Sequence, residues 1–486
     1  MSVGIHAFGG YVPRRRLQRE VIAATNAWFN PGLKGLGKGE RSIANWDEDA
    51  VTMAVEAARD ALGSTGRDGD VIQGLYLAST SLPFQDRQNA GIVAEALHLG
   101  HSLRTLDVTG SQRAGTSALV TALQAVAGGG GPVLVVGAEK RRTKAASPLE
   151  LTTGDGAAAL LIAQGGGAAR LLGHATETVD FVDHYRGQNQ AFDYVWEERW
   201  VRDEGYLEIV PKAVVRALDA AAVEPGAVTH FCFPSAARRV AAMLASKLGI
   251  PAASVRDNLQ GTCGEAGAAH PLLMLVHALE QARPGDKVLV TGFGQGCDAL
   301  VVEAGERLAA ATPLLGIAGH LTRRREETNY QRYLAINDLV TIERGLRAEV
   351  DKQTGLTTLY RNKDMLLGFS GGRCRTCETP QYPKSNVCAN PTCNAVDSQD
   401  DYPFSERTAT LNSHTADRLT DSPDPPAYYG MVQFDEGGRA MMDLADIAPD
   451  TELQVGQPMR MVFRVKDYDT NRGFRRYFWK ATPAGC

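Results

Sequence analysis

Four cysteines with a metal-binding spacing lie in the C-terminal third of the chain: Cys374, Cys377, Cys388 and Cys393, in the pattern C-x2-C-x10-C-x4-C. Each close pair fits a short turn that presents both sulfurs, and two such pairs can complete one tetrahedral zinc site. Four thiolates suit zinc, a borderline-soft ion without a preferred geometry. A closed four-cysteine site leaves no position for water, so we expect a structural Zn²⁺. The alternative is four unrelated thiols.

The remaining cysteines are isolated, and the composition is that of a globular protein. A disulfide framework would need an oxidising compartment and usually a small domain, and neither is indicated. The 486 residues are 44% apolar and 22% charged, with a net charge of −5. Without a basic block, the chain has no field to attract nucleic acid or a membrane surface. No apolar run approaches the ~20 residues of a membrane span, and the N-terminus lacks a signal-peptide pattern. We expect a cytoplasmic, multidomain α/β protein with neither nucleic acid nor membrane as partner.

Residues 1–305 alternate short apolar runs with alanine-rich helical stretches, as in βαβ units around a largely parallel sheet. We predict helices over 47–62 and 205–221. Strands are predicted over 74–80, 131–139, 230–234 and 287–294. Each half ends in a strand, a glycine-rich turn and another strand, at 154–162 and 292–303. This similarity indicates an internal duplication.

The composition changes at 306–330, where Pro, Gly and a run of charges predict a linker, followed by a helix over 331–350. From about 405 to 482 the residues alternate as in half-buried antiparallel strands. About five short strands in ~80 residues fit an OB-fold barrel. We therefore divide the chain into two similar halves, a linker with a helix, a zinc ribbon and an OB-fold, at 1–168, 169–310, 311–365, 366–400 and 401–486.

Five motifs follow one another in residues 1–305: GIHAFGGYVPRRRL (4–17), DEDAVTMAVEAARDAL (47–62), DVTGSQRAGTSAL (107–119), GDGAAALLI (154–162) and PGDKVLVTGFGQG (284–296). Together they resemble motifs of the thiolase superfamily, in particular those of 3-hydroxy-3-methylglutaryl-CoA (HMG-CoA) synthase and β-ketoacyl-ACP synthase III. Residues from about 315 onward resemble the zinc-ribbon/OB-fold proteins that accompany or are fused to acyl-CoA thiolases. The resemblance implies a duplicated thiolase-like αβαβα fold, a homodimer, and a tunnel for the pantetheine of an acyl-CoA or acyl-carrier-protein thioester.

The catalytic positions depart from the family pattern. Gln112 stands where the family has its nucleophilic cysteine, before a G-T pair and a helix. The family's glutamate falls at Thr80, and its histidine at Cys232, two positions from His230. A glutamine cannot hold an acyl group as a thioester. Its amide can still donate to a thioester or enolate oxygen at a helix N-terminus.

Three residues of the loop 260–271 are further catalytic candidates: His270, Glu265 and Cys263. His270 lies in an A-A-H-P string similar to the G-H-P of degradative thiolases, which implies a general base or a hydrogen-bond donor. Glu265 and Cys263 could take the same part. The alternatives are a core histidine beside a helix, a solvated loop carboxylate and a small buried thiol.

Two basic clusters are candidates for the phosphates of coenzyme A, one around Lys140 and one at Arg238 and Arg239. Guanidinium groups suit phosphate because they donate two parallel hydrogen bonds. The alternative for each cluster is solvated surface charge.

The sequence leaves three functions open. The first is an acyl-CoA enzyme that makes or breaks a carbon–carbon bond, of the aldol, Claisen or decarboxylation type, without a cysteine acyl-enzyme. The second is an inactive thiolase-fold scaffold that binds CoA esters or a partner subunit. The third is an HMG-CoA-synthase-like acyltransferase with a relocated nucleophile. Three or more polar groups around Gln112 would favour an enzyme, and an apolar plug would favour the scaffold.

Overall fold

The computed structural model describes residues 2–63, 71–237, 239–448 and 451–485, which form two compact units. The first unit comprises Met1–Asn45, Asp49–Val93 and Leu99–Leu339. The second comprises Trp46–Glu48, Ala94–His98 and Val340–Cys486. No helix within the described ranges is both long and apolar enough to cross a bilayer.

The sheet of the first unit has two parts with the same topology. In the first half the strand order is β1 (Val3–Tyr11), β7 (Gly156–Gln164), β6 (Val133–Glu139), β4 (Gly74–Ala78) and β5 (Arg104–Val108). In the second half it is β8 (Ala169–Thr178), β13 (Gly296–Ala304), β12 (Lys287–Phe293) and β11 (His230–Cys232). The first two pairings of each part are antiparallel and the third is parallel, which is the expected duplication. The predicted boundary at 168/169 falls between β7 and β8.

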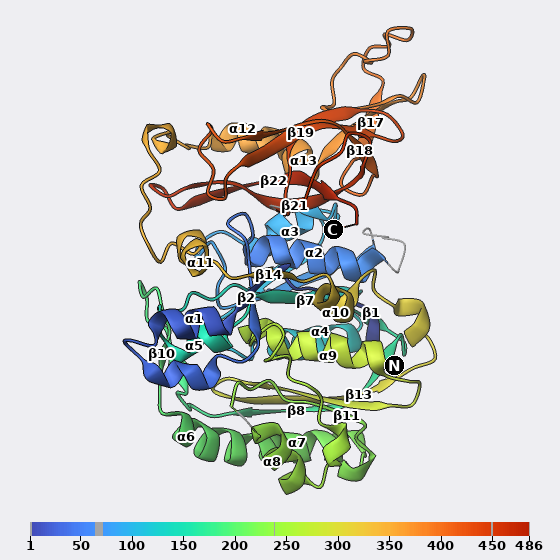
Figure 1. Ribbon diagram of the computed structural model, residues 1–486. Coiled ribbons are helices and arrows are strands. Elements are labelled where there is room, and N and C mark those ends of the chain that lie inside the picture. Colours follow the sequence, from blue (N-terminus) through green and yellow to red (C-terminus); the bar gives the residue numbers. More distant parts are fainter. Residues whose placement is uncertain (1, 64–70, 238, 449–450, 486) are drawn as a thin grey trace. The chain divides into compact units, whose positions relative to one another are not determined.

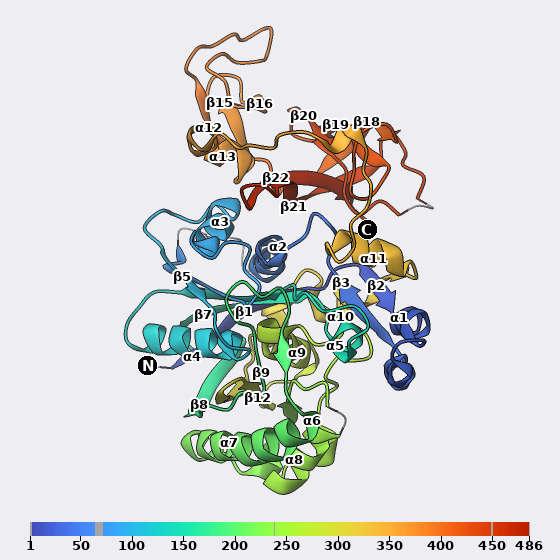
Figure 2. The same cartoon turned by 90° about the vertical axis from the view of Figure 1, so that its left-hand side faces the viewer.

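The helices complete five layers, α-β-α-β-α, as the sequence predicts (Figures 1 and 2). The middle layer is α4 (Ala114–Ala127) and α9 (His270–Gln281), which are buried between strands of both halves in one apolar cluster. The outer layers are α2 (Ala50–Leu62) on the first half, and α7 (Leu207–Ala221) with α8 (Val240–Leu248) on the second. Small residues let the middle layer pack closely: a Cβ on Gly115 would lie 2.2 Å from the carbonyl oxygen of Ala268. The start of α4 is thus pressed against the loop before α9.

The segment after the second half differs from the prediction of a linker. It forms α10 (Gly316–Thr322), β14 (Arg325–Glu327) and α11 (Tyr330–Ile336) inside the first unit, where Tyr330 and Tyr333 join an apolar cluster. The helix predicted over 331–350 ends at Ile336, because the next residues are the C-cap Asn337 and Asp338, whose φ of 54° is left-handed. The chain then makes two short helices, α12 (Leu356–Arg361) and α13 (Lys363–Leu366).

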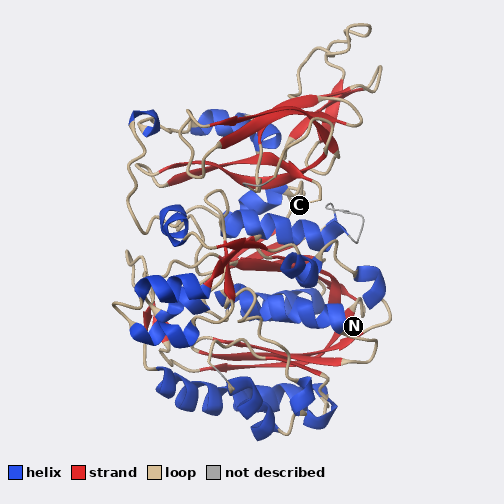
Figure 3. Cartoon of the chain, in the orientation of Figure 1, coloured by secondary structure: helices blue, strands red, loops and turns tan. Residues whose placement is uncertain are grey.

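The second unit contains two small antiparallel sheets, drawn as red strands in Figure 3. One holds the cysteines and has the order β16 (Pro380–Gln381), β15 (Ser370–Cys374) and β17 (Gln399–Pro403). The other has the five predicted strands, in the order β20 (Arg439–Asp443), β19 (Ala427–Phe434), β18 (Ala409–Asp417), β21 (Pro458–Asp469) and β22 (Phe474–Pro483). A bridge between Leu444 and Ala481 links its two edges. The sheet therefore curls toward a barrel.

Candidate functional site

A buried carboxylate at the end of β6 is the centre of the site. Glu139 accepts hydrogen bonds from the hydroxyls of Ser79 (3.1 Å), Thr80 (3.0 Å) and Ser81. It also accepts from the backbone N–H groups of Thr80 (3.1 Å) and Ala268 (3.2 Å). Burial raises the pKa of Glu139, and these hydrogen bonds offset only part of that effect. Thr80, where the family resemblance led us to expect the position of a catalytic glutamate, thus donates its hydroxyl to a glutamate from another strand.

Gln112 lies just before α4, with its amide held by a histidine. Its Nε2 is 3.2 Å from His184 Nε2, and His184 Nδ1 is 3.0 Å from a carboxylate oxygen of Asp183. The contact with Asp183 places a proton on Nδ1, and in that tautomer Nε2 accepts a hydrogen bond from the Gln112 amide. Gln112 Oε1 is buried without a hydrogen-bond partner. The amide is thus fixed on one side and has a free acceptor on the other.

Gly267 shows that Gln112 and Glu139 face the same small space. A Cβ at this position would lie 2.7 Å from Gln112 Oε1 and 2.9 Å from Glu139 Oε2. The backbone of Gly267 also has a φ of 50°, which glycine adopts without strain. Absence of a side chain here leaves the amide oxygen and the carboxylate side by side at the loop before α9.

Ion pairs hold the His184 segment over this space. The buried guanidinium of Arg141 binds Asp193 and, at 3.1 Å, Glu265. The other oxygen of Asp193 lies 3.0 Å from Arg186, which also donates to the carbonyl oxygen of Thr80. One carboxylate is thereby shared by two arginines, and these charges lower the pKa of Asp193 even though burial opposes them. The segment from Asp183 to Asp193 is tied at both ends.

His270 makes two hydrogen bonds inside its own loop. Its Nδ1 accepts from the N–H of Ala266 (3.1 Å), and its Nε2 donates to the carbonyl oxygen of Asn258 (2.8 Å). Burial lowers the pKa of His270, which keeps the ring neutral. Both ring nitrogens are therefore used to fix residues 258–266.

The two predicted thiols are deeply buried. Burial raises the pKa of both Cys232 and Cys263 to about 12. Their sulfurs face the carbonyl oxygens of Met274 (3.6 Å) and Gly264 (3.2 Å). Among the hydrogen bonds of the described residues, none joins either thiol to Gln112, Glu139 or His184. His230 pairs with Asp286 (3.3 Å) instead.

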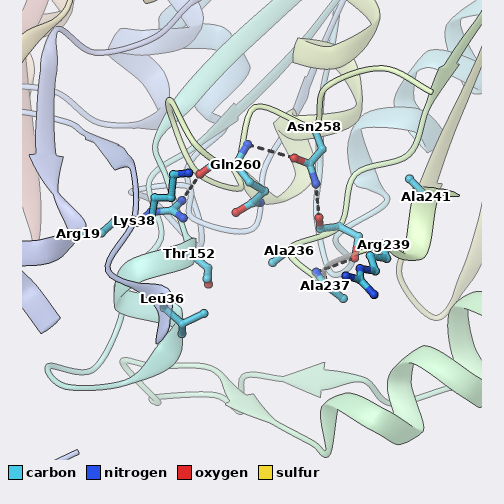
Figure 4. Close-up of a pocket in the computed structure, with 11 residues that line it drawn as sticks. Arg19, Leu36, Lys38, Thr152, Ala236, Ala237, Arg239, Ala241, Asn258 and Gln260 are labelled. Carbon is cyan, nitrogen blue, oxygen red and sulfur yellow. Dashed lines mark hydrogen bonds between the residues drawn. The ribbon is translucent and has the colours of Figure 1, made fainter. Parts of the chain in front are cut away.

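A basic pocket of about 300 Å³ opens on the first unit, lined by Arg19, Lys38 and Arg239 together with uncharged residues (Figure 4). Burial and the nearby Arg41 lower the pKa of Arg19 to about 10, so it stays charged at neutral pH. Lys140 is not part of this lining, since its ammonium donates to the carbonyl oxygen of Asn45 (3.1 Å). The predicted Arg238 lies outside the described residues.

In the second unit, the four cysteines are brought together as their spacing predicts. Their sulfurs all lie within 4.8 Å of one another, with Cys374 3.9 Å from Cys393 and Cys377 3.5 Å from Cys388. This cluster could hold one metal ion.

Some of the functional residues that were not predicted carry a partial signal in the sequence. Glu139 is the only titratable residue of β6 and ends a strand that is otherwise apolar. The hydroxyl run of Ser79, Thr80 and Ser81 follows β4, the parallel neighbour of β6, so both features meet at one sheet edge. His184 and Asp183 carry no such signal, because they lie in an irregular segment between β8 and α7.

Comparisons with known proteins agree with this architecture. The C-terminal domain family of 3-oxoacyl-[acyl-carrier-protein] synthase III matches residues 218–303, and the C-terminal OB-fold domain family of ChsH2 matches residues 403–464. Hydroxymethylglutaryl-CoA synthase of Caldivirga maquilingensis is 27% identical over 355 residues, 71% of this chain and 100% of the relative. The synthase of Aeropyrum pernix is 29% identical over 71% of this chain and 96% of its own length.

Solved structures show the same fold for the first unit. An HMG-CoA synthase complexed with CoA has a TM-score of 0.61 and 20% identity, covering 71% of this chain and 93% of its own. The 3-oxoacyl-[acyl-carrier-protein] synthase III of Aquifex aeolicus has a TM-score of 0.55 and 23% identity, covering 62% of this chain and 99% of its own.

The buried state of Glu139 predicts a pH dependence of stability. Its folded pKa is raised, so its contribution to folding is complete below the ordinary carboxyl pKa and is lost as pH rises through the folded value. As pH rises from about 5 to 8, the Tm of the wild type should therefore fall relative to that of Glu139→Gln. Thermal unfolding of both proteins across this range measures the difference.

Glu303→Gln is the matched control, because Arg170 lowers the pKa of that carboxyl. Its contribution is fully present above the ordinary carboxyl pKa and is lost only as pH falls below that value, so the Tm difference between wild type and this variant should stay constant from about pH 5 to 8. Parallel wild-type and Glu139→Gln curves would contradict a raised Glu139 pKa.

Proposed function

We propose that this chain, which joins a thiolase-like domain of the HMG-CoA synthase and 3-oxoacyl-ACP synthase III type to a C-terminal OB-fold domain, is an acyl-CoA carbon–carbon lyase or synthase. In this proposal it makes or breaks a bond next to the thioester without a cysteine acyl-enzyme. The supporting observation is the convergence of Gln112, Glu139 and the His184–Asp183 pair beside Gly267. The surroundings of Gln112 are therefore polar, which is the arrangement expected of an enzyme, whereas an apolar plug was expected of a scaffold.

The chemistry proposed is that of a thioester enolate. In the retro-aldol direction, a base takes the proton of the β-hydroxyl and the Cα–Cβ bond breaks, which releases a carbonyl product. The electron pair moves onto the thioester as an enolate, whose α-carbon is then protonated. His184 suits the base once the β-hydroxyl of the substrate takes the place of the Gln112 amide at Nε2, since Asp183 holds the ring proton on Nδ1 and would stabilise the charged ring. Glu139 suits the acid, because its raised pKa favours the protonated form.

Gln112 would stabilise the enolate oxygen. One amide hydrogen binds His184, which leaves the second free to donate near the N-terminus of α4. His270 and Glu265 would act as positioning residues, since both are committed to bonds that fix the loop and the His184 segment.

The two alternatives have less support. A nucleophile relocated to Cys263 or Cys232 would be thiolate in only about one molecule in 10⁵ at pH 7, given a pKa of about 12. An inactive scaffold would have no need for the acid Glu139, whose burial is costly, or for the Asp183–His184 pair beside it.

The phosphates of coenzyme A fit the basic pocket. Three cations and no acidic residue line it, and guanidinium groups bind phosphate well. We assign this role to Arg19, Lys38 and Arg239. The phosphopantetheine of an acyl-carrier protein is the alternative source of the same chemistry.

The enzymatic proposal is tested on a panel of β-hydroxy-, β-keto- and malonyl-CoA thioesters, with products identified by mass spectrometry. On the substrate found, Gln112→Ala should lower kcat by ~10²–10³ with little change in KM, the usual effect of removing one oxyanion donor. Arg239→Ala should instead raise KM. Full turnover by Gln112→Ala, or an acyl group attached covalently to the wild type, would exclude the mechanism.

We further propose that the four-cysteine cluster holds a structural Zn²⁺, which requires reduced thiols and so a cytoplasmic setting. Metal analysis should find about one zinc per chain, because ligand geometry and number fit zinc. Cys374→Ser should lose the metal and unfold the second unit, whereas the isolated Cys297→Ser should keep the metal. Purified protein without zinc and with all four thiols reduced would refute the assignment.

We also propose a homodimer. Strand β5 is the outer strand of the first half, with Leu106 38% exposed, so its edge can pair with a second copy that displaces Gln88 from the carbonyl oxygen of Thr105 (2.8 Å). The opposite outer strand, β11, is bridged by Val255. Light scattering at micromolar concentration should give the mass of two chains, and the mass of one chain would count against the pairing.

A further inference from the structure

A second pocket, of about 220 Å³, lies beside the candidate catalytic groups and is lined mainly by aromatic rings. We call it the aromatic pocket; its lining residues are Val182, Asp183, His184, Tyr185, Tyr194, Trp196 and Trp200. The surface it presents is almost wholly apolar. Four aromatic rings around one small hollow form a binding site for an apolar group.

The pocket has a fixed base and exposed walls. Trp200 stacks on Phe181 with ring centroids 4.1 Å apart and an interplanar angle of 13°, and both pack against the core of the second half. By contrast, Tyr185, Tyr194 and Trp196 are each more than half exposed. A group of large apolar side chains left in water at one place marks an interaction site.

His184 connects the pocket to the reaction centre. It lines the pocket and is also within hydrogen-bond distance of Gln112, at 3.2 Å. Strands β9 (His184–Tyr185) and β10 (Tyr194–Val195) form a hairpin in which Tyr185 pairs with Tyr194 and His184 with Val195. This pairing positions the tyrosines that line the pocket together with the histidine that contacts Gln112. A group in the pocket therefore lies one side chain away from the Gln112 amide.

We infer that the aromatic pocket binds the uncharged, apolar end of the acyl substrate, beyond the bond that is made or broken. The inference rests on the proposed acyl-CoA function and adds a substrate class to it: thioesters with a branched or ring-bearing apolar end. The volume is below the ~300–1,000 Å³ of sites for drug-sized ligands, so one ring or a short branched chain fits.

A cationic end group is the competing occupant, because aromatic rings also bind quaternary ammonium groups. A nearby negative charge would strengthen such binding, and the carboxylate of Asp183 is engaged by His184 Nδ1 (3.0 Å) and by the amide of Gln295 (3.4 Å). The surface that the pocket presents is almost wholly apolar, which suits a neutral group better than a cation.

Binding of three CoA thioesters to the full-length protein, measured by calorimetry, tests the inference without turnover. Acetyl-CoA has no end group, 3,3-dimethylbutanoyl-CoA has a neutral one, and betainyl-CoA has a cationic one of the same shape. Each buried methylene is worth about fourfold in affinity, so the dimethylbutanoyl ester should bind at least ~10-fold tighter than acetyl-CoA. It should also bind tighter than the betainyl ester.

Trp196→Ala should remove most of this preference and leave acetyl-CoA binding unchanged, while Trp196→Phe should restore part of it. Val215→Ala, which removes an exposed apolar side chain on α7 outside the pocket, is the matched control and should change nothing. If none of the thioesters binds, the proposed function itself fails. If acetyl-CoA binds but the three affinities are equal, if betainyl-CoA binds tightest, or if Trp196→Ala keeps the preference, the aromatic pocket has been assigned wrongly.

Discussion

The burial of one carboxylate, Glu139, is the constraint on which the candidate site of the first unit depends. An ionisable group without solvent is tolerated only when donors surround it. Glu139 takes its donors from both halves of the duplicated fold: hydroxyls and a backbone N–H from residues 79–81, and the N–H of Ala268 from the loop before α9. The end of β6, the end of β4 and the start of the second central helix must all meet at that point. The same requirement places Gly267 against Gln112.

A second buried carboxylate sets the position of Gln112 along its helix. Asp298 of β13 accepts hydrogen bonds from Thr116 (3.0 Å) and Ser117 (2.7 Å) in the first turn of α4, and lies 3.5 Å from Arg113. A strand of the second half thus holds the N-terminus of a helix of the first half. The position of the Gln112 amide is therefore set by the anchored start of α4 and by the contact with His184. A group that stabilises charge during a reaction has to be preorganised in this way.

Sequence patterns predicted what depends on periodicity and spacing. The apolar run of β6, the alternation of the five C-terminal strands and the cysteine pairs are local features, and the structure contains each of them. The meeting of Glu139 with Thr80 depends on two strands 59 residues apart in the chain, and no local pattern encodes it. His184 was missed for a different reason, since its segment has almost no regular structure and is ordered by Arg141, Asp193 and Arg186. Residues 306–330 were also misjudged from local composition, which resembles that of a linker. Tyr330, at the end of this segment, and Tyr333 pack into a core with residues that are distant in the sequence.

The duplication also suggests how one site can contact both ends of a substrate. The connection from the first strand to the first outer helix is long in each half, running from β1 to α2 and from β8 to α7. In the first half it carries Arg19 and Lys38 of the basic pocket, and in the second half it carries His184 and the rings of the aromatic pocket. The sheets and central helices are alike, because they must satisfy the same packing. The two connections lie outside that packing and are free to differ, and one is basic while the other is aromatic. In the proposed enzyme, which forms no covalent acyl intermediate, selectivity would come from these two segments: the basic one would hold phosphate and the aromatic one the apolar end of the acyl group.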